Sequence, residues 1–279
     1  MIPKHRQYPR PLVMGVLNVT PDSFSDGGRF IDPSLAMARV KEMVEEGADI
    51  IDIGGESTRP GAAAVPVAEE MERVIPLLRE IHDTLAVMVS VDTSKPEVMQ
   101  AAVSAGAGMI NDVRALRAPG AIEAVADSSA QVCLMHMQGE PRTMQDNPRY
   151  ANVIAEVGDF LFARAEACLA AGIGRDRIFL DPGFGFGKTL AHNLELMAGL
   201  DKLLELGFPL LVGVSRKSMF GALLEREVDE RLAGSVAMAA IAAWSGVSIV
   251  RAHDIAETKD AVRVAAAVRG ARQATRNET

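Results

Sequence analysis

Eight short apolar segments recur along the 279-residue sequence, and each is followed by a longer stretch with helical periodicity. The apolar segments are continuous rather than alternating, which is typical of strands in a parallel sheet whose two faces are covered. They occupy residues 12–19, 49–54, 87–92, 109–113, 132–137, 178–181, 209–214 and 247–252. The helical stretches occupy residues 34–46, 68–83, 96–105, 118–128, 153–171, 192–206, 230–244 and 256–271.

A strand–helix unit that repeats eight times, at a spacing of about 35 residues, predicts an α/β fold of the (β/α)8 or TIM-barrel type. An open, doubly wound sheet is the alternative, because the pattern alone separates the two poorly, but the count of eight favours closure. We expect residues 1–279 to form a single domain. Gly47 and Gly106 are expected to end two helices, and the polar residues 272–279 are expected to fray.

Composition excludes several classes of function. Lys and Arg number 29 and Asp and Glu 37, so the net charge is −8, which disfavours nucleic acid or an anionic membrane as the main partner. Two cysteines cannot form a disulfide framework, and no signal-peptide core follows the basic residues 1–11, so we expect a cytoplasmic protein. The longest apolar stretch, residues 233–250, contains interrupting glycines and serines and predicts a buried helix and strand rather than a membrane span.

Two motifs look like ligand-binding loops but do not fit them. In the sequence GFGFGKT only three residues separate Gly183 from Gly187, whereas a phosphate loop requires four before its Gly-Lys pair. A calcium loop beginning at Asp22 would have Phe24 in a ligand position and Pro33 where the bidentate Glu is needed. The two cysteines lack zinc-site spacing as well.

Polar residues follow the apolar segments, at the rim where barrel enzymes place their sites. Asp92 and Asp181 close two predicted strands, and Asn111 comes just after the apolar residues of a third. Each acid alone could be a helix cap. Two carboxylates and an amide at one barrel mouth, however, offer matched donors and acceptors for a flat heterocycle that carries amide groups.

Basic residues gather at the ends of the seventh and eighth predicted strands, where barrels commonly hold phosphate. They are Lys217, Arg251 and His253, and Arg59 and Arg216 add to them. Solvated surface charge is the alternative interpretation. Together with the acidic positions, they predict an enzyme that binds a polar ring deep in the barrel mouth and a phosphorylated tail at its rim.

Eight motifs in this order resemble the bacterial-type dihydropteroate synthase family over nearly the whole chain. They are MGVLNVTPDSFSDGG, DIGGESTRPGA, SVDTSKPEVM, NDVRAL, LMHMQG, LDPGFGFGK, VGVSRKSM and RAHD. The resemblance implies a TIM-barrel transferase of folate biosynthesis, normally a homodimer, that is inhibited by sulfonamides. It implies a reaction between (7,8-dihydropterin-6-yl)methyl diphosphate and 4-aminobenzoate that yields 7,8-dihydropteroate and diphosphate, with Mg²⁺.

The resemblance also assigns roles to residues. Those implied for the pterin are Asp92, Asn111, Asp181 and Lys217, with Arg251 stacked on its face. Those implied for the diphosphate are Arg251, His253 and Asn18, and Asn18 is also the implied Mg²⁺ ligand. Those implied for 4-aminobenzoate are Asp22 and Phe24 in one loop, Thr58, Arg59 and Pro60 in a second, and Ser218. The residues expected to act in the chemistry itself are Asp22, Asp92, Lys217, Arg251 and His253.

Two other functions stay open at this point. A pterin-binding methyltransferase would share the acidic ring site, but it has no need of the GESTRPG and SRKS motifs, which suit a diphosphate and a carboxylate. A catalytically silent relative that only binds pterin is the second alternative. Asn18, Asp22, Thr58 and Lys217 are all present, which argues against it.

Overall fold

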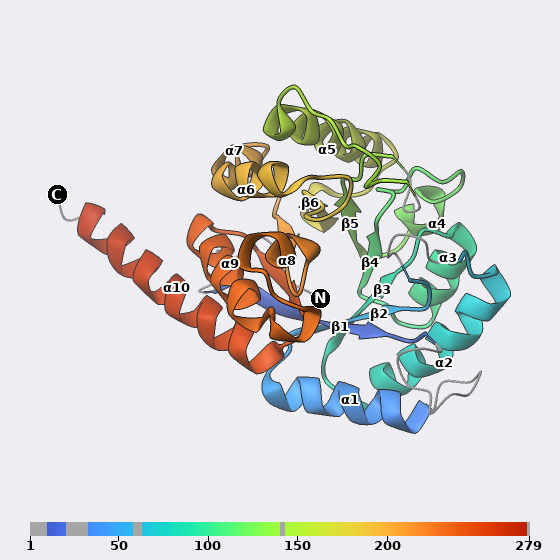
Figure 1. Cartoon of the computed structure of the whole chain (residues 1–279). Coiled ribbons are helices and arrows are strands. Elements are labelled where there is room, and N and C mark those ends of the chain that lie inside the picture. The colour runs from blue at the N-terminus through green and yellow to red at the C-terminus, as the bar shows by residue number, and fades with distance from the viewer. Residues whose placement is uncertain (1–9, 21–32, 58–62, 140–142, 278–279) are drawn as a thin grey trace.

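Eight parallel strands lie side by side around a barrel, and helices cover its outside (Figure 1). This computed structural model describes residues 10–20, 33–57, 63–139 and 143–277, with residues 273–277 as backbone only. The strands are β1 (Leu12–Asn18), β2 (Ile50–Gly54), β3 (Met88–Asp92), β4 (Met109–Asp112), β5 (Gln131–Met135), β6 (Ile178–Asp181), β7 (Leu211–Gly213) and β8 (Ile249–Ala252). All eight predicted strands are confirmed.

The strand order decides between the barrel and the open sheet. Neighbours follow the chain from β1 to β6, and β8 pairs with both β1 and β7. Between β6 and β7, Leu180 forms a parallel bridge with Leu210, and the Leu180 amide donates to the Pro209 carbonyl oxygen at 3.0 Å. This contact closes the ring, so the carboxyl ends of all eight strands meet at one rim.

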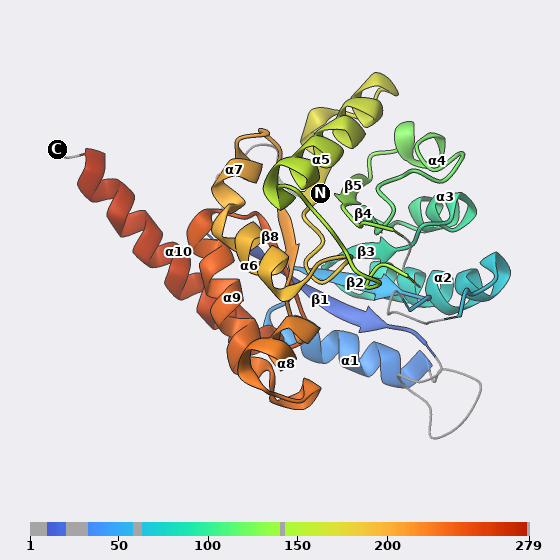
Figure 2. The same ribbon diagram turned by 45° about the horizontal axis from the view of Figure 1, so that its top comes forward.

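The helices pack around this ring in chain order, as Figure 2 shows from a second direction. They are α1 (Pro33–Glu46), α2 (Val67–Thr84), α3 (Pro96–Ser104), α4 (Glu123–Ala126), α5 (Val153–Ala170), α6 (Leu190–Ala198), α7 (Leu200–Leu204), α8 (Ser218–Leu224), α9 (Leu232–Ser245) and α10 (Ile255–Asn277). Helix α10 packs along α9, and its C-terminal end projects beyond the barrel (Figure 1).

Four helices differ from the prediction, each for a local reason. The stretch 192–206 splits at Gly199, which packs closely against α5, since an added Cβ would lie 2.3 Å from Ile154 Cδ1. Helix α4 is short, because Gly120 adopts a left-handed φ of +82° within the predicted stretch 118–128. Helix α8 was not predicted, because its seven residues are too few to show a helical periodicity. The prediction that the chain frays from residue 272 is wrong, because the backbone of α10 stays helical to Asn277. Several residues of this end are good helix formers.

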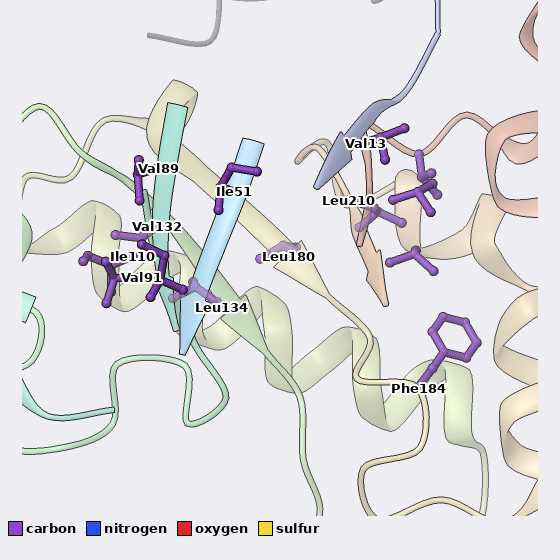
Figure 3. Close-up of a cluster of buried hydrophobic side chains, with 14 of the residues drawn as sticks. Val13, Ile51, Val89, Val91, Ile110, Val132, Leu134, Leu180, Phe184 and Leu210 are labelled. Atoms are coloured by element: carbon purple, nitrogen blue, oxygen red, sulfur yellow. The ribbon is translucent and has the colours of Figure 1, made fainter. Parts of the chain in front are cut away.

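Side chains of the strands alternate between two environments. Outward-facing residues such as Val13, Ile51 and Leu180 join helix residues in the main core (Figure 3). Inward-facing residues form a separate apolar floor inside the barrel, made of Met14, Ile50, Met109, Cys133, Phe179, Leu211 and Ile249. The floor fills the lower part of the barrel, so a ligand can approach only from the rim.

Helix ends and the longest apolar stretch agree with expectation. Gly47, Gly106 and Gly246 follow helices and adopt left-handed φ angles of +99°, +101° and +106°, as predicted for the first two. Residues 233–250 form most of α9 and the start of β8. Within the parts of the chain that the structure describes, no helix is long and apolar enough to span a membrane.

Candidate active site

A polar layer lies directly above the apolar floor of the barrel. Its members stand two positions further along their strands than floor residues, so they point into the same interior. The pairs of floor and polar residues are Ile50 and Asp52, Met109 and Asn111, Phe179 and Asp181, and Ile249 and Arg251. On β3 the inward-facing positions are Met88, Ser90 and Asp92. The alternation of the strands therefore brings these side chains to one place.

Arg251 is the centre of this layer. Its Nε donates to Asp52 Oδ2 at 2.6 Å, and its Nη2 donates to Asp92 Oδ2 at 3.1 Å. Asn111 Nδ2 donates to the same Asp52 oxygen at 3.1 Å. Residues from β2, β3, β4 and β8 thus form one network, which fixes the guanidinium against two carboxylates.

Asp181 and Lys217 occupy the opposite side of the mouth. The Gly183 amide donates to Asp181 Oδ1 at 2.7 Å and so orients the carboxylate. Lys217 precedes α8, and its Nζ lies 4.2 Å from the centre of the Phe186 ring. The Lys217 ammonium and the Arg251 guanidinium both stabilise the ionised form of Asp181.

Burial dominates the protonation of these groups. It raises the pKa of Asp92 to about 7, with Arg251 opposing and the Asp52 carboxylate adding to the rise. It raises the pKa of Asp181 to about 6, against the Gly183 N–H and Lys217. Burial, with the charge of Arg251, lowers the pKa of Lys217 to about 8. Buried groups whose pKa values lie near 7 are typical of functional sites, where they bind polar ligands and stabilise charges that develop on them.

The rim near β7 and β8 holds the remaining predicted residues. His253 accepts or donates a hydrogen bond through Nδ1 to Ser215 Oγ at 2.9 Å, and burial lowers its pKa to about 4. Arg216 forms a bidentate ion pair with Asp254 through Nε and Nη2. Its charge is therefore paired within the chain. Asn18 ends β1 beside β2, and its Oδ1 lies 3.8 Å from where a Cβ on Gly54 would stand.

The structure brings six of the predicted site residues into contact or electrostatic reach of one another. They are Asp92, Asn111, Asp181, Lys217, Arg251 and His253. Ser218 begins α8, next to Lys217, and Asn18 stands at the same rim. Asp22, Phe24, Thr58, Arg59 and Pro60 lie outside the described residues.

Sequence reasoning missed Asp52, the second carboxylate partner of Arg251. It is fully buried and sits inside β2 rather than at its end, so inspection of strand ends passed over it. The usable signal was a charged residue within the apolar run IIDIG. A buried carboxylate in a central strand requires a partner, and that requirement could have pointed to Arg251.

Comparison with known proteins gives a consistent result. Residues 14–253 match the family described as pterin binding enzyme. Dihydropteroate synthase of Escherichia coli strain K12 is 52% identical over 268 residues, which cover 96% of this chain and 95% of the relative. The enzyme of Haemophilus influenzae is 49% identical over 254 residues and covers 91% and 92%.

Solved structures agree with the sequence relatives. Yersinia pestis dihydropteroate synthase in complex with a sulfonamide drug superposes with a TM-score of 0.89 at 50% identity, over 94% of this chain and 95% of that one. The Xanthomonas albilineans enzyme with 4-aminobenzoic acid gives 0.87 at 55% identity, over 93% of each chain. The Burkholderia cenocepacia enzyme with 7,8-dihydropteroate gives 0.86 at 47% identity, over 95% and 94%. With this barrel, this polar layer and these relatives, the chain belongs to the pterin-binding enzyme family, among its dihydropteroate synthases.

Proposed function

We propose that this site joins (7,8-dihydropterin-6-yl)methyl diphosphate to 4-aminobenzoate and releases 7,8-dihydropteroate and diphosphate. The observation that carries the proposal is the polar layer, in which Asp92, Asn111 and Asp181 face the same interior as Arg251. Solved relatives with 4-aminobenzoic acid and with 7,8-dihydropteroate support the same substrate and product classes here.

The carboxylates and the amide would hold the pterin ring. A pterin edge presents amino and ring N–H donors beside a carbonyl and ring nitrogen acceptors. Asp92 and Asp181 supply acceptors, Asn111 supplies either kind, and Lys217 supplies a donor for the carbonyl side. The apolar floor below leaves no route deeper into the barrel. A flat ring therefore stacks against Arg251 with its exocyclic carbon towards the rim.

The rim would hold the diphosphate. Arg251 and His253 face it, and the neutral imidazole of His253 can donate a hydrogen bond without needing a proton from solvent. Within the described residues, no cluster of three or more His, Cys, Asp or Glu side chains could hold a metal. An Mg²⁺ ion bound here would take the side-chain oxygen of Asn18, at the end of β1, as a protein ligand and oxygens of substrate and water as its other ligands. When bound, the ion would neutralise charge on the departing diphosphate.

The chemistry requires cleavage of the carbon–oxygen bond to diphosphate, because an arylamine is a modest nucleophile. Arg251 and His253 stabilise the negative charge that grows on the leaving oxygen. The ionised Asp92 carboxylate stabilises the positive charge that grows on the pterin methylene carbon. The aminobenzoate nitrogen then forms the new bond to that carbon, and its proton leaves to solvent or diphosphate. The loops with Asp22, Phe24, Thr58, Arg59 and Pro60, together with Ser218, would hold the second substrate and exclude water.

Product analysis tests the proposal directly. Purified protein with both substrates and Mg²⁺ is expected to form 7,8-dihydropteroate, measured by chromatography, and to release an equal amount of diphosphate. A chelator is expected to stop both. Pterin binding without any product would indicate the silent relative, and methyl transfer from a methylated folate would indicate the methyltransferase. Either result would refute the proposed reaction.

Two further expectations belong to this proposal. The chain acts as a single domain over residues 1–279 and forms a homodimer. Exposed apolar side chains on α8, α9 and α10 support the dimer, and they are Leu223, Leu224, Leu232, Ile241, Trp244, Val264 and Val268. Light scattering should give about twice the 29.7 kDa mass of one chain.

A further inference from the structure

The glycine-rich segment after β6 ends in a buried lysine whose ammonium is bonded within the chain. Lys188 is only 3% exposed. Gly183, Gly185 and Gly187 adopt left-handed φ angles of +68°, +80° and +59°, which fold the segment back on itself. At Gly183 an added Cβ would stand 1.9 Å from the His136 carbonyl oxygen, so the chain passes too close for any side chain there.

The Lys188 Nζ lies in a cage of hydrogen-bond acceptors. It donates to the Gly183 carbonyl oxygen at 2.9 Å and to the Phe186 carbonyl oxygen at 3.0 Å, and it lies 3.0 Å from His136 Nδ1. Burial lowers the pKa of His136 to about 3, so its ring is neutral and Nδ1 can accept. The His136 carbonyl oxygen lies at 3.4 Å as a fourth acceptor, so the three donors of the ammonium group all have partners within the chain.

The caged segment touches both sides of the proposed pterin site. The Gly183 amide orients Asp181 at 2.7 Å, and the Phe186 ring lies 4.2 Å from Lys217 Nζ. Gly185 packs against the Lys217 stem, since a Cβ there would be 3.1 Å from Cδ. The two residues whose carbonyl groups Lys188 binds are therefore the ones that place Asp181 and Lys217.

We propose that Lys188 is a positioning residue for pterin binding, because its ammonium fastens the 183–187 segment, whose Gly183 amide orients the Asp181 carboxylate. The inference rests on the proposed function, in which Asp181 binds the pterin as a carboxylate. It adds a residue that touches no substrate and acts through Asp181.

The charged groups around Asp181 also favour its ionised form. The charged groups that face Asp181 are Lys188 on its own segment, Lys217 before α8 and Arg251 on β8, and the Cys133 thiol of β5 lies opposite. Each cation opposes the rise that burial causes in the pKa of Asp181. Burial also lowers the pKa of Lys188 to about 7, with Asp181 opposing and Lys217 adding. The effect therefore belongs to pH values below 7, where Lys188 is charged.

The experiment measures pterin affinity by calorimetry between about pH 5 and pH 7, with a 6-hydroxymethylpterin that cannot react. Wild-type affinity should fall as pH drops through the pKa of Asp181. Lys188→Met should move that midpoint upward by about one unit and weaken binding about fivefold at about pH 6, approaching about tenfold at lower pH. Lys202→Met, which removes an exposed lysine of α7, should leave the midpoint unchanged. In Asp181→Asn the fall of pterin affinity with pH should disappear, which assigns that fall to the titration of Asp181.

A second measurement does not depend on the folding of Lys188→Met. Coupling between two sites is reciprocal, so Asp181→Asn should lower the pKa of Lys188, read from the lysine ¹⁵Nζ resonance. An unchanged Lys188 pKa, or an unshifted pterin midpoint in Lys188→Met, would overturn the inference even if affinity fell at every pH. Failure of the wild-type protein to bind pterin would instead refute the proposed function, and the ¹⁵Nζ titration would still decide the coupling.

Discussion

Replacement of Asp52 by Asn tests the network that holds Arg251. The Asp52 side chain is fully buried, and its Oδ2 accepts from Arg251 Nε at 2.6 Å and from Asn111 Nδ2 at 3.1 Å. Its Oδ1 has no hydrogen-bond partner among the described residues. Asn has the same shape, so its amide oxygen can keep both bonds. Its amide nitrogen then takes the place of Oδ1, where it finds no described acceptor.

The structure sets the size and direction of two effects. Replacement of the ion pair by a bond from the charged Arg251 guanidinium to a neutral amide oxygen removes about 1–2 kcal/mol, and a buried amide N–H without an acceptor costs about 1–3 kcal/mol. We therefore expect the free energy of unfolding to fall by about 2–5 kcal/mol. The second effect concerns Asp92, whose pKa of about 7 is raised partly by the Asp52 charge. Removal of that charge should lower the Asp92 pKa by about one unit.

Two assays measure these effects on one variant. Urea unfolding reports the stability loss, and the pH profile of kcat/KM reports the pKa of Asp92 in the free enzyme. Because the ionised carboxylate is the active form, the acid limb of the profile should move to lower pH although the variant is less stable. Asp83→Asn on the exposed surface of α2 is the matched control and should change neither quantity. An acid limb that stays in place, or moves upward, would refute the electrostatic reasoning.

Three further predictions follow from the site and its surroundings. Asp181→Ala should weaken pterin binding by about 2–5 kcal/mol in calorimetry, because ring donors lose a buried acceptor; a variant with lowered melting temperature and intact affinity would show that Asp181 only caps a turn. Gly183→Ala should destabilise the fold by more than about 3 kcal/mol in urea unfolding, since its Cβ would meet the His136 carbonyl at 1.9 Å. The matched change Gly172→Ala, at φ +90° with nothing within 4 Å, should cost only the backbone strain of about 1 kcal/mol. A sulfonamide should bind weakly alone and about 1–3 kcal/mol more tightly with Mg²⁺ and diphosphate, and equal affinities in a titration would show a preformed site.

The fold was predictable because its signals are local. Continuous apolar runs, helical periodicity and glycines such as Gly47 and Gly106 report on their own segments, and the structure places the strands and these helix ends as expected. The split at Gly199 was not predictable, because it depends on Ile154 from another helix. The length of α4 depends on a turn at Gly120 that the apolar pattern does not record.

At the site, the residue types at the strand ends can be read from the sequence, and strand alternation predicts that Asp92, Asn111 and Asp181 point into a common interior. Their bonding partners depend on the folded chain. Arg251 bonds to Asp52 across 199 positions of sequence, and the Lys188 ammonium bonds to the Gly183 and Phe186 carbonyl oxygens. Barrel closure and desolvation select these partners, because the energy of a buried charge depends on which opposite charges and acceptors come within hydrogen-bond distance. That distance is a property of the folded chain, and no local pattern in the sequence records it.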